Sequence, residues 1–177
     1  MKRYIVNIIV ISALIFIIGK HIHINNRYYF WNIGYPVDKN VKAELSVREN
    51  RYILEIYGNG AIKSLIDTAN RRQYAWLADC VDMNAGWKIP LEEVIIQYGI
   101  LNLPDNAFVG CNSLETVHIS SSVSVLGKYS FAYCNNLSDI IFGGTIREWE
   151  EIEKNSPEWN LQSSIKKIIC ANGTIEI

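Results

Sequence analysis

One 13-residue pattern occurs twice in this 177-residue chain, and its constant spacing constrains the fold more than any other feature. The copies read AFVGCNSLETVHI at residues 107–119 and SFAYCNNLSDIIF at residues 130–142. Their phenylalanines, cysteines and first leucines each lie 23 residues apart. Two unrelated helices or strands would not keep so many residue types in step. The spacing therefore predicts a stacked repeat.

The register extends one unit towards the N-terminus, because LEEVII at residues 91–96 aligns with LETVHI at residues 114–119. Three strands are predicted, at residues 94–96, 117–119 and 140–142. A unit of about 20–29 residues with a leucine-led strand is typical of a leucine-rich repeat solenoid, in which each coil buries its apolar edge against the next. Three coils are near the minimum for such a stack, so segments that cap its ends are expected.

Alternation along these strands assigns their residues to two faces, since successive side chains point in opposite directions. The first and third residues of each strand are expected inside. The predicted repeat core comprises Val94, Ile96, Phe108, Cys111, Leu114, Val117, Ile119, Phe131, Cys134, Leu137, Ile140 and Phe142. The middle residues fall on the opposite face, where small exposed apolar patches can mark recognition sites. The candidate partner-binding face comprises Glu93, Ile95, Gln97, Thr116, His118, Ser120, Asp139 and Ile141.

The sequence before the repeats predicts an N-terminal cap. VKAELSV at residues 41–47 and RYILEIYG at residues 51–58 alternate apolar with polar residues, and their short connection indicates a hairpin. The stretch that follows is expected to be less regular, with a short helix around residues 65–77. Trp76 and Trp87 are expected to cover the first repeat.

The sequence after the repeats predicts a C-terminal cap that contains a helix and a hairpin. In GGTIREWEEIEKN, Thr145 is a candidate N-cap with Glu148 three residues later, the pattern of a capping box. An apolar residue at every third position gives this helix one apolar stripe. IKKIICANGTIEI predicts two short strands around Asn172 and Gly173. Asn136 and Asn172 also lie in glycosylation sequons, and we interpret both as structural asparagines.

The first 20 residues read as a signal peptide or an N-terminal membrane anchor and not as part of the folded domain. Two basic residues precede an apolar run at residues 4–18. As a helix this run would rise roughly 22 Å, against the ~30 Å hydrocarbon core of a bilayer. The following GKHIHINN lacks the small residues of a cleavage site, which favours an uncleaved anchor. An extracytoplasmic location follows, anchored to the membrane, or secreted if the leader is removed.

Export would allow the four cysteines to form disulfides. Cys111 and Cys134 occupy equivalent positions in successive coils, at a spacing that a disulfide can span. Side chains stacked on their own copies point in the same direction, which favours two buried free thiols. Nothing in the sequence suggests a pairing for Cys80 and Cys170.

Composition and motifs argue against several classes of protein. A net charge of −1 and a pI near 6.3 without a basic cluster argue against a nucleic-acid binder. Nucleophile-elbow, zinc-protease and phosphate-loop motifs are absent from the sequence, so neither an enzyme nor a cofactor is expected. His21 and His23 are interpreted as a solvated stretch and not as metal ligands. The acidic residues expected on the solvated side of the cap helix are Glu148, Glu150, Glu151 and Glu153.

These residues resemble the BspA-type leucine-rich repeat proteins, also called leucine-rich repeat type 5. The family's unit is similar to Ala-Phe, two residues, Cys, two residues, Leu, two residues, Val, one residue and Ile, which residues 107–119 reproduce. ELSVRENRYILEIYGNGAI is similar to the family's entry hairpin, and FGGTIREWEEI followed by IICANGTI is similar to its exit segment. The resemblance covers residues 35–177. It implies an exported, surface-associated binding or adhesion module.

The expected fold is α+β or mostly β: a short solenoid of about three parallel strands between two caps, preceded by an apolar helix. We expect a non-catalytic module that binds a protein or a surface polymer. The alternative is a structural spacer, or a truncated repeat protein, without a ligand of its own. The predicted divisions are the leader (1–20), a juxtamembrane linker (21–40), the N-terminal cap region (41–90), the repeats (91–143) and the C-terminal cap (144–177).

Overall fold

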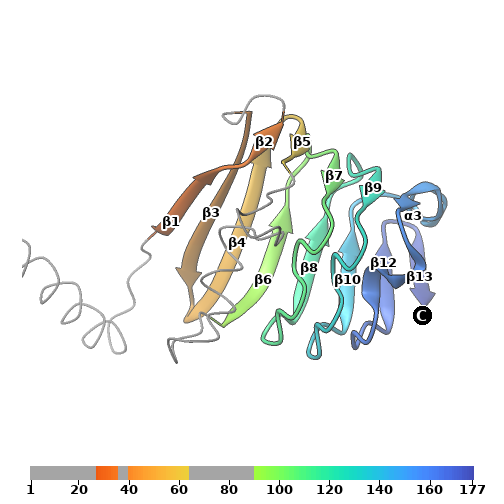
Figure 1. Cartoon of the computed structure of the whole chain (residues 1–177). Coiled ribbons are helices and arrows are strands. Elements are labelled where there is room, and N and C mark those ends of the chain that lie inside the picture. Colours follow the sequence, from red (N-terminus) through yellow and green to blue (C-terminus); the bar gives the residue numbers. More distant parts are fainter. Residues whose placement is uncertain (1–26, 36–39, 64–89) are drawn as a thin grey trace, which may run out of the picture.

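The structure, a computed structural model, describes residues 27–35, 40–63 and 90–177, which stack into the coils shown in Figure 1. Strands β6 (Leu91–Ile96), β8 (Thr116–Ile119) and β10 (Asp139–Phe142) lie side by side and parallel. In their register Val94 pairs with Val117, and Val117 pairs with Ile140. Partners are therefore 23 residues apart, so the repeat in the sequence is the spacing of neighbouring coils.

The main sheet contains five parallel strands instead of the three that the repeat predicts. Strand β4 (Arg51–Gly58) runs parallel to β6, and β12 (Lys167–Cys170) runs parallel to β10. Both come from segments that were expected only to cover the ends. A terminal repeat strand leaves one row of backbone groups unpaired, and an added strand satisfies them. The expected strand count was too small for this reason.

Antiparallel strands complete the sheet on both sides. Strand β3 (Val41–Arg48) pairs with β4 across a two-residue turn, and β13 (Gly173–Glu176) pairs with β12. Both turn residues between β3 and β4, Glu49 and Asn50, have positive φ, as tight hairpins require. Beyond β3 lies β1 (Arg27–Asn32), which gives an eight-stranded sheet with the order β1-β3-β4-β6-β8-β10-β12-β13.

The folded domain begins earlier than the sequence suggests. Residues 21–40 were expected to be a linker, but β1 pairs with β3, and β2 (Gly34–Tyr35) pairs with β5 (Ala61–Ile62). Ile33 between β1 and β2 is 2% exposed. Long-range pairing of this kind leaves no periodic signal in the sequence, which is why the boundary at residue 40 was wrong.

Several expectations fall outside the described residues. They concern the leader, including the membrane contact through residues 4–18, and also His21, His23, the helix around residues 65–77, Trp76, Cys80 and Trp87. Among the helices that the structure does describe, none has both the length and the apolar character to cross a bilayer.

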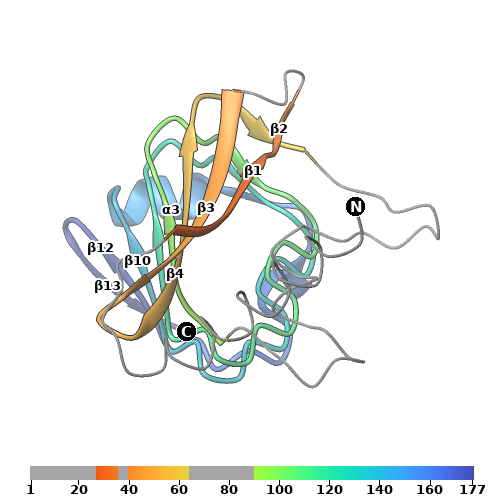
Figure 2. The ribbon, with the colours of Figure 1, turned by 90° about the vertical axis from the view of Figure 1, so that its left-hand side faces the viewer.

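A second, smaller sheet forms on another side of the coils. It consists of the parallel strands β7 (Asn102–Leu103), β9 (Val125–Leu126) and β11 (Glu153–Lys154). Figure 2 looks along the stack and shows the coils superimposed around a common interior. Each repeat thus adds one strand to the main sheet and one strand to the smaller sheet.

Helix α3 (Ile146–Glu151) is shorter than its apolar stripe suggests. The capping box is present: the Thr145 hydroxyl accepts from the Glu148 N–H, and the Glu148 carboxylate accepts from the Thr145 N–H. Ile152 leaves the helix in an extended conformation with its side chain buried. Glu153 therefore lies in β11 and not on the solvated side of the helix. Asn172 supports the helix start, because its Oδ1 accepts from the Ile146 N–H at 2.8 Å.

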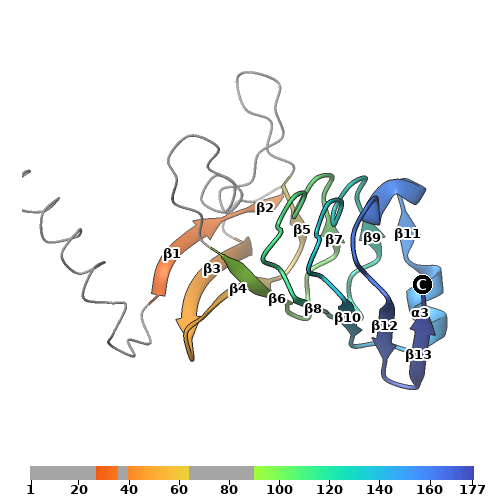
Figure 3. The same cartoon turned by 90° about the horizontal axis from the view of Figure 1, so that it is seen from below.

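The interior is one continuous apolar column. All twelve residues assigned to the repeat core are at most 3% exposed. The rings of Phe108 and Phe131 stack with centroids 5.5 Å apart and planes 12° apart. Figure 3 shows the end of the stack that carries α3, β12 and β13. Towards this end the column continues through Trp159 and Trp149 to Phe142, with successive ring centroids 5.4–6.2 Å apart.

Cys111 and Cys134 are free buried thiols, as their equivalent positions predict. The Cys134 thiol donates to the carbonyl oxygen of Phe108 at 3.1 Å, one coil away. Burial raises the pKa of Cys134 to about 12, so this sulfur stays protonated at physiological pH. The two cysteines therefore act as small apolar core residues.

Candidate functional site

The outer face of the main sheet carries the residues that the sequence assigns to partner binding. We define the outer face as the side chains of β4, β6, β8, β10 and β12 that point away from the apolar column, and it forms three rows across the strands. The first row is Ile53, Glu93, Thr116, Asp139 and Lys167; the second is Glu55, Ile95, His118, Ile141 and Ile169; the third is Tyr57, Gln97, Ser120 and Gly143.

Inner and outer positions of the same strands differ in how strictly they repeat. Inside, successive coils place Val94, Val117 and Ile140 in one row, and all three are fully buried. Outside, the corresponding central row changes from Ile95 to His118 to Ile141. Packing dictates the inner identities because every coil must fit the same column. The outer identities are not set by this constraint.

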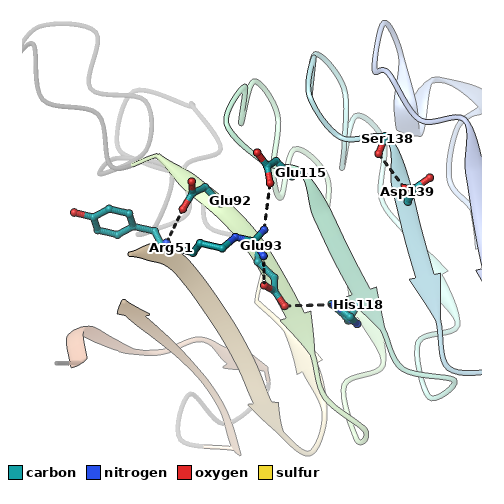
Figure 4. A network of polar contacts seen from close by, with 8 residues as sticks. Arg51, Glu92, Glu93, Glu115, His118, Ser138 and Asp139 are labelled. Atoms are coloured by element: carbon teal, nitrogen blue, oxygen red, sulfur yellow. Dashed lines mark hydrogen bonds and ion pairs between the residues drawn. The ribbon is translucent and has the colours of Figure 1, made fainter. Parts of the chain in front are cut away.

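An ion-pair network occupies the N-terminal part of the outer face (Figure 4). The Arg51 guanidinium lies 3.3 Å from Glu93 and 3.3 Å from Glu115, so it links β4 to β6 and to the segment that enters β8. The other oxygen of Glu93 lies 3.4 Å from Nε2 of His118 on β8. The outward imidazole therefore packs beside a carboxylate that Arg51 already contacts.

Other acidic side chains in this part also have partners. Glu92 accepts from the backbone N–H of Tyr52 at 2.9 Å. Glu55 forms an ion pair with Arg48 and accepts from the Gln97 amide at 3.4 Å. Most charged side chains in the N-terminal part of the outer face thus contact other polar groups of the same part.

The C-terminal part of the outer face is different in character. In its register Asp139 is beside Lys167, and Ile141 is beside Ile169. Asp139 accepts from the Ser138 hydroxyl at 3.0 Å, also visible in Figure 4, and Lys167 makes a long contact of 3.8 Å with Glu176. Ile169 is 38% exposed. Here two isoleucines lie next to one acidic and one basic side chain.

Sequence reasoning missed residues that shape this face. Arg51 and Glu55 belong to the N-terminal hairpin, and Lys167 and Ile169 belong to the C-terminal hairpin, so none of them is part of the 23-residue repeat. Their outward positions in alternating strands would have been a usable signal if the two hairpins had been expected to extend the sheet. All eight residues predicted for the face lie on β6, β8 or β10 or directly after β6 and β8.

The outer face mixes apolar, hydroxyl and charged side chains. Among the described residues, no group of three or more His, Cys, Asp or Glu side chains gathers as a metal site would require. The face combines carboxylates, hydroxyls, an imidazole and isoleucines on a rigid sheet. Such a mixture of apolar and hydrogen-bonding groups is common at protein interfaces.

Comparison with known proteins supports the repeat architecture. Residues 85–176, just over half of the chain, match the family described as "BspA type Leucine rich repeat region (6 copies)". A solved leucine-rich repeat protein from Eubacterium ventriosum ATCC 27560 has a similar fold, with a TM-score of 0.51 and 19% sequence identity. The similarity covers 79% of this chain but only 37% of that protein. At this identity the likeness concerns the fold alone. No curated protein matches the chain.

Proposed function

The chain belongs to the BspA-type leucine-rich repeat family, and from this premise we propose that it is a non-catalytic module that binds a protein or a surface polymer through the outer face. Leucine-rich repeats generally serve protein binding. The observation that carries the proposal is the contrast between the two faces of the same strands: the inner residues repeat, whereas the outer residues change from coil to coil. Side chains that the fold does not dictate are the ones that can specify a partner.

The central row contributes most to the proposed recognition. Ile95, His118 and Ile141 are partly buried, so their side chains are already ordered by their neighbours. When a partner covers these side chains, they lose little conformational entropy, because they are already ordered. Covering them also removes apolar area from water. The flanking hydroxyls and carboxylates then provide directional contacts that select the partner.

The test is a binding screen of the full chain in lipid vesicles against purified surface proteins and surface polysaccharides. Any ligand found is measured again with Ile95→Glu, His118→Glu and Ile141→Glu. We expect each substitution to weaken binding while the thermal midpoint changes little. Leu101→Glu is the matched control, because Leu101 is 48% exposed and lies outside the three rows. A ligand that binds all three variants like the wild type would refute the proposal.

We further propose that the module is exported and held at a membrane by residues 4–18. The basic start, the apolar run and the missing cleavage pattern support this assignment. The sheet begins at Arg27, so the eight residues 19–26 would join it to the anchor and reach at most about 28 Å when extended. A C-terminal epitope should stay in the membrane fraction and be digested by protease added outside intact cells. Protection of the epitope would contradict export, and its appearance in the soluble fraction would contradict anchoring.

A structural spacer is the second candidate function. The ion-pair network around Arg51 favours it, because these outer charges contact one another and hold neighbouring coils together. The substitutions in the central row discriminate the two candidates. A spacer would tolerate all three without any phenotype, whereas a binding module would lose its partner.

A further inference from the structure

The C-terminal part of the outer face is complementary to itself. Asp139 and Lys167 are neighbours in one row, and Ile141 and Ile169 are neighbours in the next row on the same two strands. A rotation of 180° about an axis parallel to the strands, midway between β10 and β12, exchanges the positions of these two strands. Two copies related by such an axis would place Asp139 opposite Lys167 of the second copy, and Ile141 opposite Ile169.

From this arrangement we propose that two copies of this chain associate face to face through β8, β10, β12 and β13, with the two-fold axis between β10 and β12. Each contact is made twice, as an isologous interface requires. The two Asp–Lys contacts pair opposite charges, and the two isoleucine contacts remove apolar surface from water. Sheets packed in this way lie about 10 Å apart, a distance that an aspartate and a lysine side chain can bridge together.

The strands on either side fit the same axis. Strand β8 of one copy faces β13 of the other, because β8 pairs with β10 and β13 pairs with β12. The register then sets Thr116 opposite Glu176, and His118 opposite Thr174. Neither contact brings like charges together, and both partners in each can form hydrogen bonds.

The N-terminal part does not have this property. An axis between β6 and β8 would set Ile95 opposite His118 and, one strand further out, Glu55 opposite Ile141. The second contact would bury a carboxylate against an aliphatic side chain, at a cost in free energy. The charges there also already contact Arg48 and Arg51. An axis between β6 and β8 is therefore unfavourable, and we place the association in the C-terminal part.

The size of the patch sets the strength of the association. Four strands and two rows span about 19 Å by about 13 Å, from the usual strand spacing and rise. This is well below the roughly 800 Å² per partner of a standard interface. The dimer is therefore weak, with a dissociation constant between about 1 µM and about 1 mM. This inference goes beyond the proposed function and does not depend on the identity of a ligand. The dimer covers His118 and Ile141, so a ligand at the central row would compete with it.

Sedimentation velocity of the full chain in detergent micelles tests the proposal over about 1 µM to about 1 mM protein. We expect the wild type to pass from monomer to dimer within this range. Ile169→Glu should raise the dissociation constant by about tenfold or more, because two carboxylates would enter the apolar contact. Ile95→Glu is the matched control: it lies in the same row on β6, outside the four strands, and should leave the dimer unchanged.

Exchanging the charges of residues 139 and 167 distinguishes the specific Asp–Lys pairing from nonspecific association. Lys167→Asp alone sets carboxylates opposite each other twice, and Asp139→Lys alone does the same with ammonium groups. Each single variant should weaken the dimer by about tenfold or more, and the double variant Asp139→Lys, Lys167→Asp should restore it. Lys167 is 48% exposed, so these variants decide the question even if Ile169→Glu fails to fold.

Three outcomes would overturn the proposal. They are a wild type that stays monomeric over the whole range, a dimer that Ile169→Glu and Lys167→Asp leave intact, and a double charge exchange that fails to restore association. Association through the leader alone would give the second outcome. If the dimer proposal fails, the proposed binding of a ligand by the central row is still tested independently, because that test measures binding of the screened ligand and not self-association.

Discussion

The five parallel strands of the main sheet continue into an antiparallel hairpin on each side, β3–β4 at the N-terminal end and β12–β13 at the C-terminal end. At the N-terminal end, Arg51 contacts the repeats at the surface and is 40% exposed. At the C-terminal end, Trp149 and Trp159 are 4% and 6% exposed and continue the column of phenylalanine rings. The N-terminal end of the stack thus carries an ion-pair network at its surface, whereas the C-terminal end carries buried aromatic rings in its interior.

This difference indicates which contacts carry stability. Burying a large aromatic side chain contributes several times more than an exposed ion pair, which is typically worth about 0–1 kcal/mol. The N-terminal hairpin is held mainly by its buried aliphatic residues, such as Leu54 and Ile56, and by its strand pairing. We therefore expect the surface charges to adjust the N-terminal end and the aromatic rings to be indispensable at the C-terminal end.

The largest effect is expected for Phe131→Ala, which removes the ring between Phe108 and Trp159. The loss of burial and the resulting cavity should cost about 3–5 kcal/mol, a large part of the about 5–15 kcal/mol of a typical domain. Denaturant unfolding monitored by circular dichroism measures the change. Tyr98→Ala is the control, since Tyr98 is 79% exposed and should change stability by less than about 0.5 kcal/mol. Equal effects of the two changes would place the ring outside the core.

At the N-terminal end the largest effect is expected for Gly58→Ala. Gly58 closes β4 with φ +117°, and a Cβ there would overlap the carbonyl oxygen of Asn40. We expect a loss of about 2–3 kcal/mol from backbone strain and overlap. Gly110→Ala is a matched control, because its φ is +72° but a Cβ would meet nothing within 4 Å. It should cost only about 1 kcal/mol by the same denaturant measurement. Similar values would mean that the contact with Asn40 is not tight.

Thr145→Ala tests the capping box at the C-terminal end and should cost about 1 kcal/mol. The Thr145 N–H, followed by its hydroxyl, holds the pKa of Glu148 below its ordinary value. A lowered carboxyl pKa in the folded state stabilises the protein above the ordinary pKa of about 4.3 and loses this effect as the pH falls through the folded value. As the pH is lowered from 7, the thermal midpoint should therefore decline less steeply in Thr145→Ala than in the wild type. The decline that remains is due to the backbone N–H of residue 145, which the substitution keeps. An unchanged slope would contradict the assignment.

The smallest effect is expected for Arg51→Met, which keeps the aliphatic stem and removes the charge. The loss should be at most about 1 kcal/mol and should shrink as salt rises, because exposed ion pairs are screened. Thermal midpoints at low and high salt measure this dependence. Arg147→Met is the control: it removes a more exposed pair with Glu151, within helix α3, that joins no two coils. A loss from Arg51→Met that reaches the cost of Phe131→Ala would reverse the comparison of the two ends.

Much of the repeat region could be read from the sequence because one physical rule governs it. Each coil must present the same apolar shape to its neighbours, so Phe108 and Phe131, or Val94 and Val117, recur at a fixed spacing. Strand alternation then assigns Ile95, His118 and Ile141 to the other side without further information. The thiols and the capping box follow from equally local rules.

The ends could not be read in the same way. Leu54 pairs with Val94 and Ile140 pairs with Ile168, at separations of 40 and 28 residues that break the 23-residue period. Arg51 reaches Glu115 across 64 positions in the sequence. Contacts of this kind depend on which sheet edge remains unpaired after the coils have stacked. No local sequence pattern indicates which edge this is.

The sequence by itself determined the coil, because a periodic interior requires periodic residues. It also determined the inward or outward direction of each repeat side chain, because that direction depends only on strand alternation. Only the tertiary structure decided that both hairpins extend the sheet and that β1 belongs to the domain. It also decided that Asp139 lies beside Lys167 and Ile141 beside Ile169. Those placements result from edge strands that recruit backbone partners across variable separations, a choice made by the assembled stack and not by neighbours in the chain.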